Sequence, residues 1–180
     1  MEDSLHPVIS KSTVEFITVS REYCAMLENT KKIDIKDFLN QSQKILALLY
    51  LKASLLPNFE YCLNEDNTHF VTEQDYLFIQ GKVSNLLGSH DVFTDVIQPD
   101  SIVEDETTNL CLSELFADIY QDLRNVLELY SSGETEIMND GLCECAENFK
   151  TYWGPRLIAL LQIIHKLLYS NIDFDNNESI

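Results

Sequence analysis

Glycine and proline are scarce in this sequence, and long apolar runs are missing from it. Only five Gly and four Pro occur among its 180 residues, which leaves little turn chemistry for a fold of many strands. The longest apolar stretches, at residues 45–51 and 157–168, are shorter than the roughly 20 residues that a membrane-spanning helix needs. Residues 1–4 lack the features of a secretory signal, and the five cysteines are an odd number, typical of reduced thiols. We therefore expect a cytoplasmic protein with no membrane association.

Basic residues are scarce in the middle of the chain. Residues 61–147 carry two Lys or Arg against nineteen Asp or Glu, whereas residues 1–60 carry seven against eight. Such a negative surface repels nucleic acids and anionic lipids, and it attracts cations and basic proteins. The pattern predicts no nucleic-acid binding, and a basic protein partner would suit it. Solubility alone is the alternative, which we favour.

The spacing of the apolar residues indicates helices throughout the chain. The expected helices span residues 8–28, 35–56, 73–87, 109–130, 134–153 and 156–170. Asp34 and Thr72 are the expected N-caps of the second and third helices. The sequence Ser-Ser-Gly at residues 131–133 predicts a tight turn, which returns the fifth helix antiparallel to the fourth. Gly154-Pro155 predicts a stop or a sharp kink before the sixth helix.

These elements predict an all-α fold, a bundle of five or six helices built from up-down hairpins. We expect one domain over residues 1–170 and a frayed acidic tail at residues 171–180. The second and sixth helices are apolar nearly all round, so both are expected in the core. Residues 58–71 read as a polar loop. Residues 88–107 are predicted to form an irregular acidic connection. Loops of this length are uncommon in a compact domain and are often functional.

Two columns of carboxylates stand on the fourth and fifth predicted helices, at Glu114, Asp118 and Asp122 and at Asp140, Glu144 and Glu147. Carboxylates that face each other across a helical bundle can hold Mg²⁺ or Mn²⁺. One hypothesis therefore makes Asp118, Asp122, Glu144 and Glu147 the metal ligands of a phosphohydrolase, because helical nucleotide pyrophosphohydrolases carry similar Glu-x-x-Glu pairs. The alternative, which we favour, is two solvated acidic faces without a cofactor.

Aromatic and basic side chains near these columns suggest a recognition surface. Trp153 and Arg156 stand three residues apart, a spacing that allows a cation–π pair. Tyr, Trp and Arg carry much of the binding energy at protein interfaces. The predicted interaction residues are therefore Tyr120, Trp153 and Arg156, together with Asp118 and Asp122. Ordinary packing of these side chains is the alternative, which we favour.

Other motifs in the sequence are incomplete. His69 and the pair His90-Asp91 have the residue types of the histidine-aspartate phosphohydrolases, but they fall in or beside predicted loops. Cys143 and Cys145 lack the second ligand pair of a zinc site. His165 stands in an apolar helix, where we expect a hydrogen-bonded core histidine.

Several strings of the sequence resemble a family of uncharacterised bacterial proteins from gut anaerobes, which share a domain of unknown function. They are Phe-Val-Thr-Glu-Gln-Asp-Tyr at 70–76, Leu-Leu-Gly at 86–88 with His90-Asp91, Ala-Asp-Ile-Tyr-Gln-Asp-Leu at 117–123, Met-Asn-Asp at 138–140, Tyr-Trp-Gly at 152–154 and Arg-Leu at 156–157. The resemblance covers the last two-thirds of the chain and implies a small helical cytoplasmic protein. The resemblance implies no particular activity and identifies no site residues. A looser likeness in size and acidity is to redox-enzyme maturation chaperones of the TorD type.

The sequence thus contains no complete catalytic set. The function it favours is that of a protein-interaction or regulatory module, chaperone-like and not enzymatic. The alternatives are the divalent-metal phosphohydrolase described above and an acidic decoy that mimics nucleic acid.

Overall fold

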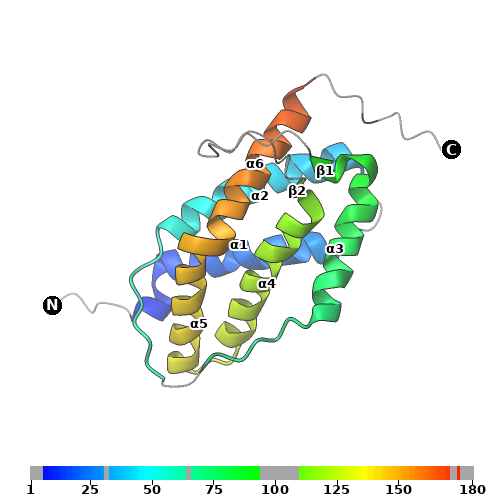
Figure 1. The fold of residues 1–180 in the computed structure, drawn as a ribbon. Helices are drawn as coiled ribbons and strands as arrows, with labels where there is room; N and C mark the ends of the chain where they lie inside the picture. The colour runs from blue at the N-terminus through cyan, green and yellow to red at the C-terminus, as the bar shows by residue number, and fades with distance from the viewer. Residues whose placement is uncertain (1–5, 31–32, 64–65, 94–109, 171–173, 175–180) are drawn as a thin grey trace, which may run out of the picture.

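The computed structural model describes residues 6–30, 33–63, 66–93, 110–170 and 174 of the chain. In this described part the helices are α1 (Lys11–Glu28), α2 (Ile35–Ser54), α3 (Glu73–Leu87), α4 (Leu112–Ser131), α5 (Thr135–Asn148) and α6 (Gly154–Tyr169) (Figure 1). Short turns, η1 (Pro7–Ile9) and η2 (Gly88–His90), accompany them, and a π-helical segment, η3 (Phe149–Trp153), joins α5 to α6. The predicted all-α bundle is confirmed. The predicted tail at residues 171–180 lies outside the described residues, except for Phe174.

One small element was not expected from the sequence. The strands β1 (Val92–Phe93) and β2 (Leu110–Cys111) pair antiparallel at the two ends of the long acidic connection. Most of that connection, residues 94–109, lies outside the described residues. In the described part of the chain, no helix is long and apolar enough to cross a bilayer.

The helix starts follow the local capping chemistry. Asp34 accepts a hydrogen bond from the N–H of Lys36 at 2.8 Å and caps α2, as predicted. Thr72 and Asp75 form a reciprocal capping box at the start of α3, so this predicted cap is also confirmed. Ser10 caps α1 through the N–H of Thr13.

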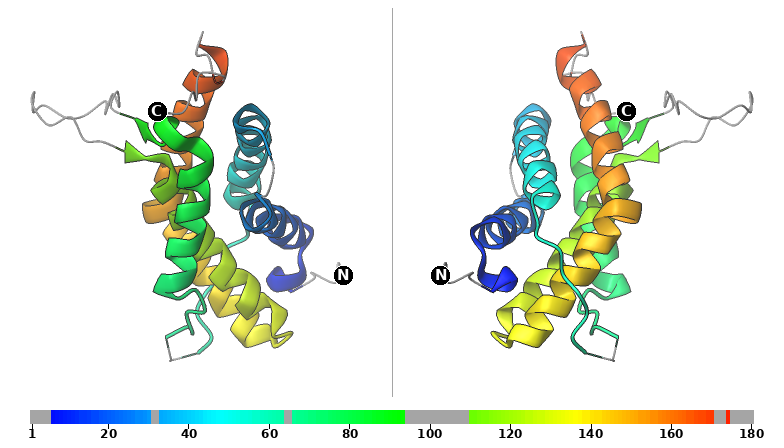
Figure 2. Two further views of the ribbon diagram at one scale, coloured as in Figure 1. Left: turned by 90° about the vertical axis from the view of Figure 1, so that its right-hand side faces the viewer. Right: turned by 90° about the vertical axis from the view of Figure 1, so that its left-hand side faces the viewer.

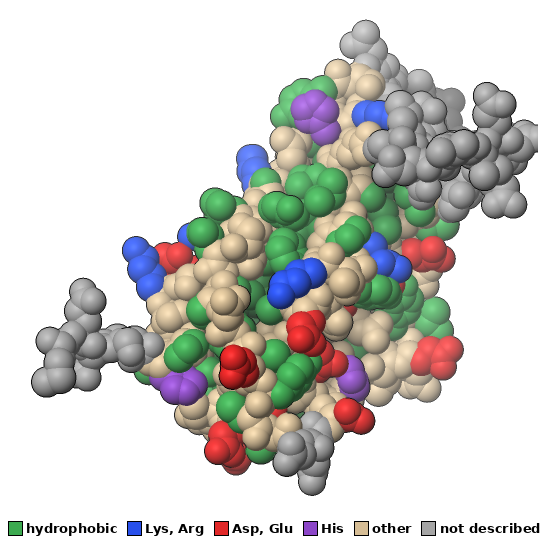
Figure 3. All heavy atoms as spheres, turned by 60° about the vertical axis from the view of Figure 1, so that its left-hand side comes forward, with side chains coloured by type: hydrophobic (Ala, Val, Ile, Leu, Met, Phe, Trp, Pro, Cys, Tyr) green, Lys and Arg blue, Asp and Glu red, His purple; other side chains and the backbone are tan. Residues whose placement is uncertain are grey.

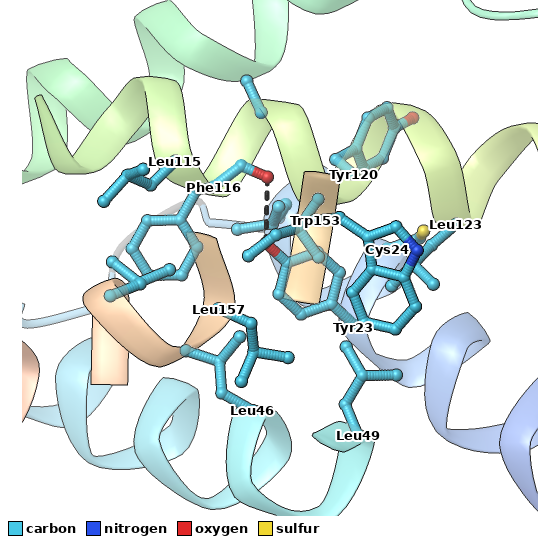
Figure 4. Close-up of a cluster of buried hydrophobic side chains, with 14 of the residues drawn as sticks. Tyr23, Cys24, Leu46, Leu49, Leu115, Phe116, Tyr120, Leu123, Trp153 and Leu157 are labelled. Carbon is cyan, nitrogen blue, oxygen red and sulfur yellow. Dashed lines mark hydrogen bonds between the residues drawn. The ribbon is translucent and has the colours of Figure 1, made fainter. Parts of the chain in front are cut away.

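The core forms around α4, which contacts α1, α3, α5 and α6 (Figures 1 and 2). Figure 4 shows its side chains meeting those of α1, α2 and α6, with Trp153 and Tyr23 in the middle. Tyr23 is fully buried, and its hydroxyl donates a hydrogen bond to the carbonyl of Phe116 at 2.9 Å. The expectation that α2 and α6 lie in the core holds for one side of each helix, where Leu46 and Leu157 are fully buried. The other side of each helix faces solvent, at Leu51 and Ile158.

Of the two outcomes predicted at Gly154-Pro155, a stop or a sharp kink, the structure excludes the stop. Residues 135–169 stay helical throughout, because the five-residue π-helical segment η3 precedes the dipeptide. Pro155 is the second residue of α6 and directly follows the π-helical segment, and its missing N–H does not end the helix. The chain therefore changes its helical geometry here without ending the helix.

Candidate functional site

An extended segment, residues 58–71, crosses α5 and α4 before it reaches α3 (Figure 1). We call it the strap; residues 64–65 within it are not described. Side chains of the two helices accept hydrogen bonds from part of its described backbone. Asp140 accepts the N–H groups of Cys62 at 2.7 Å and Leu63 at 2.8 Å. Asn125 accepts those of Phe70 at 2.7 Å and Val71 at 3.0 Å. These bonds replace the ladder that an extended segment lacks when no strand lies beside it.

Asp140 is fully buried beneath the strap. Burial alone would raise the pKa of its carboxyl, but the N–H donors of Cys62, Asn139 and Leu63 outweigh it and lower the pKa below its ordinary value. Asp140 is therefore an ionised anchor of the strap. It was predicted in an acidic column on the surface, and the structure places it in the interior.

The strap, α4 and α5 enclose a cavity of about 310 Å³. This volume lies at the lower end of the range of ligand pockets. The described lining consists of His69, Gln121, Asp122, Asn125, Val126, Leu129, Gly141, Glu144, Cys145, Asn148 and Tyr152. We call it the carboxylate pocket, because Asp122 and Glu144 both belong to it.

Asp122 is the more buried of the two carboxylates. One of its oxygens, Oδ1, accepts a hydrogen bond from Asn148 Nδ2 at 2.6 Å. Burial raises the pKa of Asp122 to about 6, and the charges of Glu144 and Asp118 act in the same direction. The hydrogen bond from Asn148 and the charge of His69 oppose that rise without cancelling it. The carboxylate is thus ionised at neutral pH, but its neighbours only partly offset the cost of burying its charge.

Glu144 faces the strap across the pocket. Its Oε2 accepts a hydrogen bond from Asn67 Nδ2 at 2.7 Å, and its Oε1 lies 3.6 Å from His69 Nε2. The other ring nitrogen of His69 lies 3.4 Å from Asn125 Nδ2. His69 therefore stands between a helix amide and a helix carboxylate, and it is the one titratable base among the described lining residues.

Asp118, one turn before Asp122, lies beside the pocket and is fully paired. It accepts hydrogen bonds from Arg156 Nε at 2.6 Å and from the Tyr76 hydroxyl at 2.9 Å. The guanidinium of Arg156 also lies over the ring of Tyr152, 3.7 Å from its centroid. The cation–π partner of Arg156 is therefore Tyr152, which lines the pocket, and not Trp153 as the sequence suggested.

Two predicted interaction residues are not available to a partner. Trp153 is fully buried, stacks near Phe16 and donates its indole N–H to the carbonyl of Cys145 at 3.0 Å. Tyr120 is only 6% exposed, and its hydroxyl donates to Glu28. The alternative of ordinary packing is therefore correct for both side chains, because the π-helical turn and the packing of α4 on α1 direct them inward. Arg156, Asp118 and Asp122 remain at or near the surface.

The four predicted metal ligands do not meet at one point. Asp122 and Glu144 share the carboxylate pocket, but Asp118 is paired with Arg156. Glu147 is exposed and accepts a hydrogen bond from the hydroxyl of Tyr61 at 3.0 Å. Among the described residues, no three His, Cys, Asp or Glu side chains are arranged to hold a metal ion.

The remaining histidines have structural surroundings. His90 lies against the ring of Phe174, and Asp91 accepts the N–H and hydroxyl of Ser113 at the start of α4. Asp91 thus anchors the beginning of α4. His165 is exposed beside Tyr169, so the expectation of a core histidine is wrong.

Proteins similar to this chain share its fold, and their descriptions name no activity. The family model for a domain of unknown function, DUF5063, matches residues 7–170. The chain belongs to the DUF5063 family. A similar crystal structure is that of protein BF1032 from Bacteroides fragilis, a structural-genomics target, with 33% identity and a TM-score of 0.83 over 93% of this chain and 98% of that chain. No curated protein matches the sequence. The predicted family resemblance is confirmed, and the match also includes most of the first third of the chain.

Sequence reasoning on this DUF5063 protein missed the amides of the pocket. Asn125 and Asn148 each bond a group that only the folded chain brings near, the strap backbone for one and Asp122 for the other. A signal for Asn125 was present. Asparagine is unfavourable in the interior of a helix, yet Asn125 stands directly beside the apolar stripe of the most clearly amphipathic helix.

Proposed function

We propose that this DUF5063 protein is a cytoplasmic binding module, and that its carboxylate pocket receives a cationic side chain of a basic partner protein. One observation carries the proposal. Asp122 and Glu144 line one cavity, and neither Lys nor Arg is among its described lining residues. Its cysteines are all free thiols, as in a reducing compartment.

The electrostatics of the pocket favour a cation. Burial removes water from the carboxylate of Asp122. An opposite charge therefore stabilises this carboxylate more than it would stabilise a solvated one. At about 4 Å and an effective dielectric constant near 20, a pair of unit charges attracts by about 4 kcal/mol. The amide oxygens of Gln121 and Asn148 can accept further hydrogen bonds from an ammonium or a guanidinium.

The surroundings of the pocket suit a protein partner. Phe70 follows His69 on the strap and is 45% exposed, and Tyr152 at the pocket is 37% exposed. Exposed aromatic side chains beside a charged pocket are typical of protein interfaces. Acidic side chains gather at the same end of the molecule (Figure 3), so a basic chain would be steered toward it.

Calorimetric titration with a hexa-arginine and a hexa-lysine peptide tests the proposal. The double variant Asp122→Asn, Glu144→Gln is expected to bind at least one of them roughly 30-fold more weakly than the wild type, a loss of about 2 kcal/mol. The control Glu73→Gln, Glu136→Gln removes the same charge at exposed positions outside the pocket, and we expect it to lose less than about 3-fold.

Other outcomes would replace the proposal. Equal losses of peptide affinity in the two double variants would mean that binding depends on the overall negative charge and not on the pocket, as expected of a nucleic-acid-mimicking decoy. A thermal shift with Mg²⁺ or Mn²⁺ alone, abolished by the pocket variant, would support the metal-dependent alternative instead. No peptide binding to the wild type at low salt would refute the module.

The raised pKa of Asp122 makes its charge costly to the fold, so Asp122→Asn is expected to stabilise the protein. The folded-state pKa of about 6 lies above the ordinary 3.8, so ionisation of Asp122 opposes folding above both values. We expect the variant to gain about 1–2 kcal/mol in unfolding free energy near pH 7.5, with the gain vanishing as the pH falls from about 6 to about 4. Urea unfolding at several pH values measures this.

The matched control is Asp118→Asn, which removes the same charge one turn away. Because Asp118 pairs with Arg156 and Tyr76, this variant should lose stability at neutral pH. If both variants change stability in the same direction, the pocket does not penalise the Asp122 charge.

A further inference from the structure

One side of α2 presents a row of leucines to solvent. Leu48, Leu51 and Leu55 are 43%, 51% and 54% exposed. Their spacing of three and four residues puts them on the same side of the helix. A row of large apolar side chains on a helix is ordinarily buried, so its exposure here needs an explanation.

Residues of α6 extend this surface. Ile158 and Tyr169 of α6 are 51% and 65% exposed, and Tyr50 of α2 is 39% exposed. The two helices pack side by side: Gln43 Nε2 donates to the Tyr169 hydroxyl at 3.2 Å, and the Tyr50 ring lies 5.2 Å from that of Phe149. Apolar side chains accordingly gather where α2 and α6 run in Figure 3. We call this surface the α2–α6 face, made of Leu48, Tyr50, Leu51, Leu55, Ile158 and Tyr169.

The charge around the α2–α6 face differs from that of the rest of the molecule. The only acidic residue of α2 is Asp37, against Lys36, Lys44 and Lys52. Residues 148–170 contain two Lys and one Arg but neither Asp nor Glu. The whole chain has a net charge of −18, most of which lies in residues 61–147. The α2–α6 face is therefore apolar and slightly basic on a strongly acidic protein.

We propose that the occupant of the α2–α6 face is a second copy of this chain. Two copies that meet through their acidic ends bring many like charges together, whereas two that meet through this face set only a few basic side chains against each other. A two-fold dimer uses the same patch on both subunits, so the patch must be self-complementary. A row of leucines meets this condition, because it can interdigitate with the same row of a second copy. A basic partner, by contrast, has no electrostatic reason to dock here. This arrangement leaves the carboxylate pocket open and does not depend on the function proposed for it.

Sedimentation velocity on the full chain over micromolar concentrations tests the dimer. We expect the wild type to move from its monomer mass of 20.7 kDa to twice that mass as the concentration rises. Added salt should strengthen the association, because it screens the repulsion between two acidic copies.

The variant Leu51→Glu, Leu55→Glu is expected to weaken the dimer roughly 100-fold, because it sets four carboxylates into an apolar contact. Both positions are exposed in the single chain, so the helical circular dichroism should stay that of the wild type. The control is Leu77→Glu, Phe78→Glu, which charges another exposed apolar pair, 53% and 63% accessible on α3. It should leave the dimer intact.

Two results would overturn the inference. A wild type that stays monomeric at every concentration and salt would mean that a second copy is not the occupant. A dimer that survives the α2 variant, or that the α3 variant weakens equally, would place the interface elsewhere.

Discussion

Gly154→Ala is expected to be among the most destabilising single-methyl additions to this protein, with a loss of about 3 kcal/mol in unfolding free energy. A Cβ at Gly154 would overlap the backbone carbonyl oxygen of Phe149 and would stand 3.0 Å from Cδ2 of its ring. The backbone of Gly154 is ordinary right-handed helix, so the cost is steric and not conformational. A carbonyl within a helix cannot move aside without disturbing the turn that it belongs to.

Thermal unfolding measures the effect, which should lower Tm by roughly 6–12 °C for a protein of this size. The matched control is Gly81→Ala in α3, where an added Cβ would meet nothing within 4 Å. Because alanine favours helix over glycine, that variant should gain about 0.5–1 kcal/mol. If both alanine variants gain stability, the close approach at the π-helical turn does not exist.

Asp140→Ala is expected to release the strap, with a loss of about 3 kcal/mol or more. The variant leaves the N–H groups of Cys62 and Leu63 without their acceptor, and it removes one of the acceptors of the Asn139 amide. His69 and Asn67 lie further along the same segment. The carboxylate pocket should therefore lose its outer wall, and peptide binding should weaken together with stability.

Hydrogen exchange measures this locally through the amides of Cys62 and Leu63, which should lose protection far more than those of α1. The variant Asp140→Asn serves as the graded control, because its amide keeps one acceptor oxygen and turns a donor toward the other N–H. The lowered pKa of Asp140 means that its stabilisation is present above the ordinary value and is lost as the pH falls through the lowered one. A difference between wild type and Asp140→Ala that grows on acidification would contradict the anchor role.

Asp122 and Asp140 show why the candidate site was only half predictable. Both were assigned to acidic columns from helical spacing, and that spacing is correct. The structure then lowers the pKa of Asp140 and raises that of Asp122, because the strap donates backbone N–H groups to one and buries the other beside Glu144. The donors come from a segment more than 70 residues away in the sequence, so local pattern could not assign them.

Trp153 and Arg156 show the same limit at the helix junction. Their spacing suggested a stacked pair, but the π-helical segment changes the angle between them. Trp153 consequently packs in the core, and Arg156 pairs with Asp118 and Tyr152. A proline signals that a regular helix is disturbed; whether the chain stops or widens its turn depends on what packs around it.

By itself, the sequence determined the helical class, the span of α3 with its capping box, and the separation of an acidic middle from a balanced N-terminal third. These follow from interactions between near neighbours in the chain and from composition, both of which can be read in one dimension. Only the tertiary structure decided which polar side chains face one another, that the strap closes a pocket over two carboxylates, and that Leu48 and Leu51 of α2 stay exposed while its other leucines are buried. Each of these depends on contacts between distant segments, and burial and pairing are properties of those contacts.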